Sequence, residues 1–159
     1  MNKVDSIVLH CTATPEGRDV DIKDIDRMHR ARGFRCVGYH YVVKLDGTVQ
    51  KGRPENEEGA HCNTKGSSSA SYNRHSISIS YVGGLPSDGK TPKDTCTPAQ
   101  KAAIERLIRD IVARYPIREI IGHRDTSPDT NRNGKVDSFE YIKACPCFDA
   151  IPEYRHLLG

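Results

Sequence analysis

The sequence lacks the features that mark several classes of protein. No apolar run approaches the length that spans a membrane, and residues 1–6 carry no basic segment followed by a long apolar stretch, so neither a membrane span nor a signal peptide is predicted. The net charge of +3 is too small to indicate nucleic acid binding. No internal repeat is visible. We therefore expect one monomeric domain over residues 1–159 that stays in the cytoplasm, without membrane insertion or a nucleic acid partner.

Cysteine is present but does not indicate disulfides. The six cysteines could form three bridges, yet the missing export signal favours reduced thiols, some of which could bind metal. We interpret Cys11, Cys36, Cys62 and Cys96 as small, at least partly buried side chains. A domain of this length buries roughly 70% of the surface that its unfolded chain exposes, so it needs neither metal nor disulfide merely to fold.

Short apolar runs and alternation predict the strands. Residues 75–82 alternate Ile77, Ile79 and Tyr81 with serines, which is typical of a half-buried strand. The Asp46-Gly47 pair between apolar alternations predicts a hairpin. The further predicted strands are residues 4–9, 37–44 and 48–52, and a late apolar run covers residues 117–123.

Two segments have helical spacing. Residues 21–32 place apolar side chains on one face and stop at Gly33, while Thr97-Pro98-Ala99-Gln100 begins a second helix with a capping box and ends before Pro116. The order of elements predicts an α/β domain with a central mixed sheet flanked by helices. Residues 53–74 and 83–96 are long polar loops, where we expect a substrate cleft.

Two of the apolar runs end on a histidine. His10 closes the first run, His123 closes the late one, and Cys145 follows in the sequence Lys143-Ala144-Cys145. Strand ends are where α/β sheets present functional groups. Two imidazoles and one thiolate leave the fourth tetrahedral position of a zinc ion open, which distinguishes catalytic from structural zinc sites. The residues therefore suggest a zinc enzyme.

Several segments, in order from about residue 4 to 150, form a recognisable pattern. They are Ile7-Val8-Leu9-His10-Cys11-Thr12-Ala13-Thr14, Val37-Gly38-Tyr39-His40-Tyr41, Lys44-Leu45-Asp46-Gly47-Thr48-Val49, Val82-Gly83-Gly84, Thr97-Pro98-Ala99-Gln100 and Lys143-Ala144-Cys145-Pro146-Cys147-Phe148-Asp149. This pattern resembles the phage-lysozyme type of zinc N-acetylmuramoyl-L-alanine amidase. Peptidoglycan recognition proteins share that fold.

The resemblance implies a hydrolase that cuts the amide between N-acetylmuramic acid and L-alanine in peptidoglycan. It also implies that His10, His123 and Cys145 hold Zn²⁺, and that Tyr39 and Lys143 flank the reacting groups. A lysine suits stabilisation of an oxyanion, and a tyrosine can hydrogen-bond the nucleophile or that oxyanion and assist proton transfer to the leaving amine.

The resemblance leaves several assignments to weigh. Gly59-Ala60-His61 is similar to a loop that lines the substrate cleft in this family, which implies a binding role for His61. Cys147 would face the same side as Cys145 in an extended strand, but the intervening proline and the family pattern favour Cys145. Some recognition proteins that lack the cysteine bind peptidoglycan without cleaving it, so a non-catalytic binding module is the alternative; the presence of Cys145 favours hydrolysis.

A second metal signature covers residues 129–140, which fit D-x-[DN]-x-[DN]-G-x5-E at every position. The predicted Ca²⁺ ligands are Asp129, Asn131, Asn133, the carbonyl of Lys135, Asp137 and Glu140. This EF-hand-like loop is an insertion relative to the phage-lysozyme pattern. Pro128 precludes a full helix-loop-helix hand, and two amide ligands in place of carboxylates weaken the site. We hypothesise that calcium bound to this loop fixes the approach of His123 and Cys145 to the zinc. Taken alone, the loop would instead suggest a regulatory protein that calcium switches.

The missing export signal and the missing wall-binding domain resemble a phage or prophage lytic enzyme. Such an enzyme waits in the cytoplasm until another factor breaches the membrane, and then acts on the cell wall. The alternative is a host enzyme that takes part in cell-wall recycling.

Overall fold

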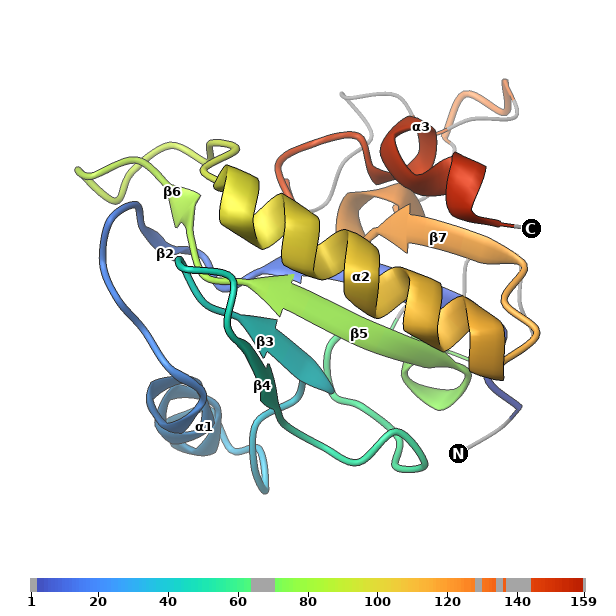
Figure 1. Cartoon of the computed structure of the whole chain (residues 1–159). Helices are drawn as coiled ribbons and strands as arrows, with labels where there is room; N and C mark the ends of the chain where they lie inside the picture. The colour runs from blue at the N-terminus through green and yellow to red at the C-terminus, as the bar shows by residue number, and fades with distance from the viewer. Residues whose placement is uncertain (1–2, 64–70, 128–129, 134–135, 137–143, 159) are drawn as a thin grey trace.

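A computed structural model describes most of the chain. The residues that it describes are 3–63, 71–127, 130–133, 136 and 144–158. Within them a five-stranded sheet has the order β4-β3-β5-β1-β7 (Figure 1). Its strands are β1 (Ser6–Cys11), β3 (Tyr41–Val43), β4 (Val49–Lys51), β5 (Ser76–Tyr81) and β7 (Glu119–Gly122).

The sheet is mixed, as the order of elements predicts. β1 pairs in parallel with both β5 and β7, while β3 pairs in parallel with β5 and antiparallel with β4. A second, two-stranded sheet joins β2 (Thr14–Pro15) to β6 (Gly84–Leu85). The predicted α/β class with a central mixed sheet is therefore confirmed.

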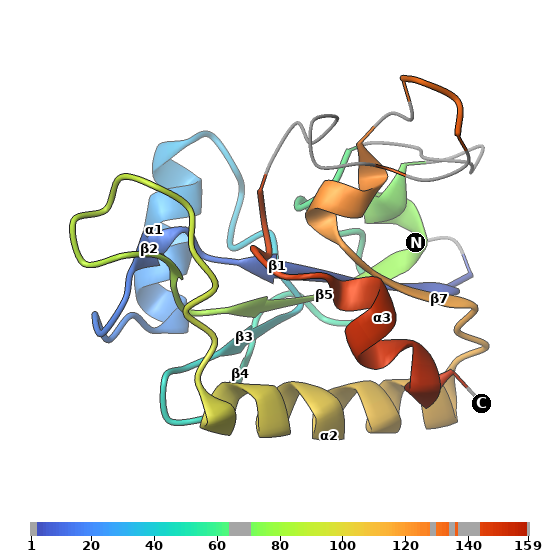
Figure 2. The same ribbon diagram turned by 90° about the horizontal axis from the view of Figure 1, so that it is seen from above.

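Helices cover both faces of the sheet. Figure 2 shows α2 (Pro98–Arg114) along one face and α1 (Ile22–Ala31) on the other, with α3 (Ala150–Tyr154) beside β7. Both long helices begin with a capping box, Asp21 with Asp24 and Thr97 with Gln100, so the capping box predicted for α2 is confirmed. Among the described residues, no helix has the length and apolar character needed to cross a membrane. The described residues also form three short 3-10 helices: η1 (Tyr72–Arg74), η2 (His123–Thr126) and η4 (Arg155–Leu157).

The two faces of the sheet differ in chemistry. Ile7 and Leu9 of β1 belong to the apolar core cluster together with Ile104 and Ile108 of α2. The side chains that alternate with them in β1, including His10, face the opposite side. In β5, Ser76, Ser78 and Ser80 lie on this second face.

The second face is not open to solvent, so the expectation of a half-buried β5 is wrong. All six residues of β5 are buried, and each serine hydroxyl is fully covered. The covering groups include histidines, since Ser78 Oγ contacts His40 Nδ1 at 3.1 Å and Ser76 Oγ contacts His61 Nε2 at 3.3 Å. The serines and histidines therefore form a polar layer on the second face of the sheet. The candidate site lies on this layer.

The predicted strand over residues 37–44 is shorter in the structure. Only Tyr41–Val43 pairs within the sheet. The preceding carbonyls bind loop residues instead: Gly38 accepts from the Ala60 N–H at 3.0 Å and Tyr39 accepts from the Arg53 N–H at 3.0 Å. Gly38 permits this close approach, because a Cβ there would lie 2.2 Å from the Ala60 carbonyl oxygen.

Candidate metal centre and cleft

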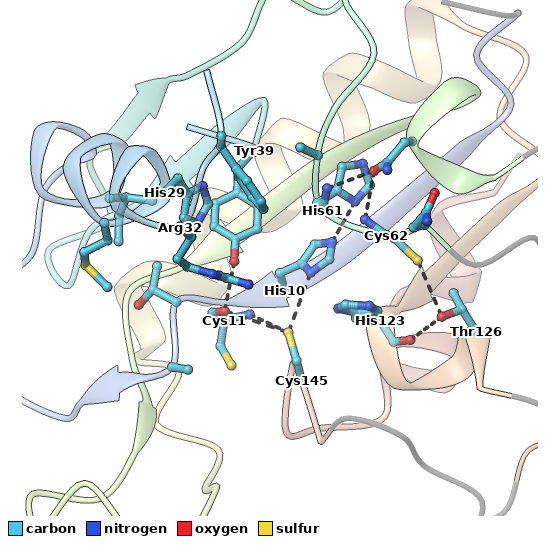
Figure 3. A pocket seen from close by; sticks show the side chains of 18 of the residues that line it. His10, Cys11, His29, Arg32, Tyr39, His61, Cys62, His123, Thr126 and Cys145 are labelled. Atoms are coloured by element: carbon cyan, nitrogen blue, oxygen red, sulfur yellow. Dashed lines mark hydrogen bonds between the residues drawn. The ribbon is translucent and has the colours of Figure 1, made fainter. Parts of the chain in front are cut away.

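Three predicted metal ligands meet at one edge of the sheet. One ligand atom from each of His10, His123 and Cys145 lies within 4.8 Å of the other two. The rings of His10 and His123 are 4.7 Å apart between centroids, and His10 Nδ1 lies 3.7 Å from Cys145 Sγ (Figure 3). Two ligands of a tetrahedral zinc, with bonds of about 2.0–2.1 Å to nitrogen and about 2.3 Å to sulfur, stand roughly 3.5 Å apart. The donor set therefore fits a zinc ion, and the distance between His10 Nδ1 and Cys145 Sγ is close to the expected one.

Strand register brings the two histidines together. β1 and β7 are parallel, and their last paired residues are Leu9 and Gly122. His10 and His123 each follow directly, at the carboxyl edge of neighbouring parallel strands. The chain turns into η2 at His123, so that imidazole leaves the plane of the sheet beside His10.

Backbone contacts anchor Cys145. The Cys11 N–H donates to Cys145 Sγ at 3.0 Å, and the Arg124 N–H donates to the Cys145 carbonyl at 2.7 Å. The following residue, Pro146, packs on Gly122, where a Cβ would lie 2.6 Å from the proline Cδ. β1 and the start of η2 thus fix the third ligand beside the first two.

The competing thiol, Cys147, is directed elsewhere. Its Sγ donates to the Gly84 carbonyl at 3.7 Å, and Cys147 does not belong to the metal-ligating group. Contact with the Cys11 thiol and burial raise the pKa of Cys147. Contact with Cys145 raises the pKa of Cys11 to about 12. Both neighbours of Cys145 therefore remain protonated thiols.

Tyr39 lies against the metal ligands. Its ring centroid is 5.2 Å from that of His10, and its hydroxyl is 3.5 Å from the Cys11 carbonyl. Burial, followed by the nearby Cys145 and Cys11 sulfurs, raises the pKa of Tyr39 well above its usual value. The hydroxyl therefore keeps its proton at neutral pH and can act as a hydrogen-bond donor. His29 supports it, since His29 Nδ1 accepts from the Gly38 N–H at 2.8 Å and the two rings are in contact.

A cavity of about 580 Å³ opens above this centre. Arg32 and Phe34 line one wall beyond the end of α1, and residues 60–63 line another. Arg32 lies beside Tyr39 in Figure 3, and its guanidinium is 5.2 Å from the centroid of the Phe34 ring. The expectation that residues 53–74 line a cleft is thus met in part.

Residues 83–96 do not line this cavity, so that part of the expected cleft is wrong. Gly84 pairs with Thr14 in the small sheet, and the Lys93 N–H donates to the Gly84 carbonyl at 2.9 Å. This pairing holds the loop beside β2. Arg32 and Phe34 line the cavity instead, and nothing in the sequence pattern predicted that these two residues would do so.

His61 belongs to the cavity wall but is itself buried. Its Nδ1 lies 2.9 Å from His10 Nε2, a contact that the sequence did not reveal. Burial, with smaller effects from His40, His123 and Arg53, lowers the pKa of His61 well below its usual value, so the ring is neutral. His61 therefore contacts the predicted metal ligand His10. Its role in substrate binding stays a prediction.

Several predicted residues lie outside the described part of the chain. They are Lys143, Asp129, Lys135, Asp137 and Glu140. Of the predicted calcium ligands, Asn131 and Asn133 are described, and the Asn133 N–H donates to Asn131 Oδ1 at 3.2 Å. That contact is an Asx turn, which Asn forms readily in loops.

Comparisons with known proteins agree with the resemblance seen in the sequence. A family model described as N-acetylmuramoyl-L-alanine amidase matches residues 1–138. An endolysin of Escherichia phage T7 is 34% identical over 145 residues, which cover 91% of this chain and 82% of the endolysin. The solved N-acetylmuramoyl-L-alanine amidase LysC from Clostridium intestinale URNW matches with a TM-score of 0.66 and 25% identity, covering 98% of this chain and 83% of that one. PGRP-SA of Apis mellifera shares the fold, with a TM-score of 0.67, 21% identity and coverage of 98% and 83%.

Proposed function

The chain belongs to the N-acetylmuramoyl-L-alanine amidase family, and we propose that it is a zinc enzyme that cuts the bond between N-acetylmuramic acid and L-alanine in peptidoglycan. The observation that carries the proposal is the convergence of His10, His123 and Cys145 at the floor of a 580 Å³ cavity. Two nitrogens and one sulfur form the donor set of catalytic zinc sites with an open fourth position. Bound there, zinc supplies Lewis acidity and a water-derived nucleophile at neutral pH.

We assign catalytic roles to two side chains of the chain. Tyr39 holds its proton on the hydroxyl and lies against His10, so it can donate a hydrogen bond to an oxygen that gains negative charge during hydrolysis. The leaving amine of L-alanine needs a proton, and the same hydroxyl can assist that transfer. Lys143 precedes Cys145 by two residues, and its ammonium group is the second proposed donor to the developing oxyanion.

Hydrolysis of purified peptidoglycan tests this function. With zinc present, we expect new N-terminal alanine in the soluble products, and we expect a zinc chelator to abolish its release. Cys145→Ala should remove zinc and activity together. Binding to peptidoglycan without new N-terminal alanine would refute the enzyme and support the non-catalytic binding module. New amino termini other than alanine would refute the proposed bond.

We keep calcium binding by residues 129–140 as a separate proposal, which the complete loop signature supports. Its role would be structural, because the loop joins His123 to Cys145. Calorimetric titration of the metal-free protein with Ca²⁺ should show one site that Asp129→Ala removes, and calcium should raise the affinity for zinc. Absence of calcium binding would refute the site. Binding without any change in zinc affinity would refute the clamp.

We propose a lytic role of the phage type, in which the enzyme acts as a monomer on the cell wall after it leaves the cytoplasm. Its partner is then peptidoglycan. Light scattering of the purified protein should give a mass close to 17.7 kDa. Expression in a bacterium should be harmless until the membrane is permeabilised; lysis of intact cells from inside without permeabilisation would contradict the need for release.

A further inference from the structure

A line of buried hydrogen bonds runs from the metal centre into the polar layer of the sheet. It joins His10 Nε2 to His61 Nδ1 at 2.9 Å, His61 Nε2 to Ser76 Oγ at 3.3 Å, and Ser76 Oγ to the Tyr72 carbonyl at 2.5 Å. All three side chains are buried. Figure 3 shows His10 between His61 and Cys145.

The far end of this line sets the direction of every proton in it. A carbonyl oxygen only accepts, so the single hydroxyl proton of Ser76 is committed to the Tyr72 carbonyl. Ser76 Oγ must then accept from His61, which places the proton of the neutral His61 ring on Nε2. His61 Nδ1 is left as an acceptor, and His10 must donate to it from Nε2.

The consequence falls on His10. With its proton on Nε2, the ring presents an unprotonated Nδ1 on the other side, and this is the atom that lies 3.7 Å from Cys145 Sγ. In the opposite tautomer His10 Nδ1 would carry the proton, and a protonated Nδ1 could not bind a metal. A metal-ligating imidazole typically has its second nitrogen held in this way by a neighbouring acceptor.

His61 is itself held firmly. The N–H groups of His61 and Cys62 both donate to Asn73 Oδ1 at 2.8 Å. The ring packs edge-on against His10, with centroids 4.9 Å apart at 86°. Gly59 leaves room for it, because a Cβ at Gly59 would lie 2.4 Å from His61 Cδ2. These contacts leave the ring one orientation, so its Nδ1 stays directed at His10.

We propose that His61, backed by Ser76, is a positioning residue that fixes the tautomer and ring plane of His10 so that Nδ1 faces the metal. The inference rests on the proposed zinc site. It gives His61 a part in assembling the metal centre, in addition to its place in the cavity wall.

Zinc affinity tests the proposal without reference to activity. His61→Leu keeps apolar bulk but removes the acceptor, and we expect zinc binding to weaken about 10- to 100-fold in competition with a chromophoric chelator. His61→Asn places an amide oxygen near the position of Nδ1 and should restore most of the loss. Equal loss in both variants would indicate a packing role and overturn the proposal, as would unchanged zinc affinity in His61→Leu.

Two serines provide a matched pair of further variants. Ser76 and Ser78 lie on the same face of β5, and both are fully buried. Ser76 contacts His61, whereas Ser78 contacts His40 and lies outside the line of bonds that leads to His10. Ser76→Ala should weaken zinc binding more than Ser78→Ala does. Equal effects of the two substitutions would overturn the proposal.

Nitrogen-15 spectra of the histidine rings separate this inference from the proposed function. In the metal-free protein His10 should carry its proton on Nε2, and His61→Leu should shift His10 toward the other tautomer. If the parent protein binds no zinc, the proposed function fails, while the His10 tautomer still decides the inference. A parent protein with His10 protonated on Nδ1 would overturn it.

Discussion

Acid should weaken the fold through one carboxylate, Glu55. This side chain follows β4 and accepts hydrogen bonds from Arg114 at 2.6 and 2.9 Å, from Tyr115 at 3.1 Å, and from Tyr41. Arg114 and Tyr115 stand at the end of α2, and Tyr41 lies in β3, so Glu55 joins the helix to the sheet. None of these four residues lines the cavity, which keeps the test separate from catalysis.

The magnitude follows from the pKa of Glu55. The Arg114 hydrogen bonds, supported by those of Tyr41 and opposed by burial, lower the pKa from 4.5 to about 2. A difference of about 2.5 pH units corresponds to about 3 kcal/mol of folding stability. The Arg114 side chain is 41% exposed, so solvent screening makes this an upper bound.

Because the pKa of Glu55 is lowered in the folded protein, folding stability should decrease as the pH falls. Above pH 4.5 both the folded and the unfolded protein carry a charged Glu55, and the full stabilisation is present. As the pH falls, the unfolded chain binds the proton first, so stabilisation is lost between about pH 4.5 and 2. About 2 kcal/mol of it should be gone at pH 3.

Denaturant unfolding from pH 7 to pH 3 measures this effect. Glu55→Gln should be less stable than the parent at pH 7 and should lose about 2 kcal/mol less on acidification. Glu105→Gln is the control, because Glu105 pairs at the exposed surface, with Arg109 in α2 and with His156 at 3.8 Å, and the Arg109 pair contributes only about 0.3–0.5 kcal/mol. If Glu55→Gln and the parent lose stability equally between pH 7 and 3, the assignment of the pKa to these contacts is refuted.

Three further predictions concern the metal centre. Tyr39→Phe should lower kcat by about 10²- to 10⁴-fold and leave the zinc affinity unchanged. Because the pKa of Tyr39 is raised, ionisation of this tyrosine should not reduce the rate of the parent enzyme below pH 10. A Tyr39→Phe variant with full activity would contradict the catalytic role of Tyr39. Cys145→Ser should lose zinc in metal analysis, whereas Cys147→Ser should retain it, and the reverse result would exchange the two assignments. Gly59→Ala should displace the His61 ring and destabilise the protein by about 1–3 kcal/mol in thermal unfolding, and a variant as stable as the parent would contradict that packing.

Local physics made much of the fold predictable. The capping box that begins α2 at Thr97 and the alternation of β5 depend on neighbours within a few residues, so the sequence reveals them directly. The histidine that closes each of two apolar runs is a similar local signal. The resemblance to a known family then supplied Tyr39 and Lys143, which no local pattern marks.

The placement of groups across the sheet was not predictable in this way. Whether residues 83–96 would line the cleft depended on the pairing of Gly84 with Thr14, which no periodicity encodes. The burial of the serine face of β5 likewise depended on histidines from other segments. Alternation indicates which side chains share a face, but it cannot say what covers that face.

The sequence by itself determined which residues could form a metal centre, because ligand chemistry belongs to the side chains and strand ends can be read from local hydrophobicity. Only the tertiary structure decided which of them meet. The parallel register of Leu9 with Gly122 places His10 beside His123, and the loop that carries His61 brings a second imidazole to His10 Nε2. His10 and His61 are 51 positions apart in the sequence, and contacts over such a separation arise from packing of the whole chain. The hydrogen bonds that orient His10 therefore form only in the folded protein.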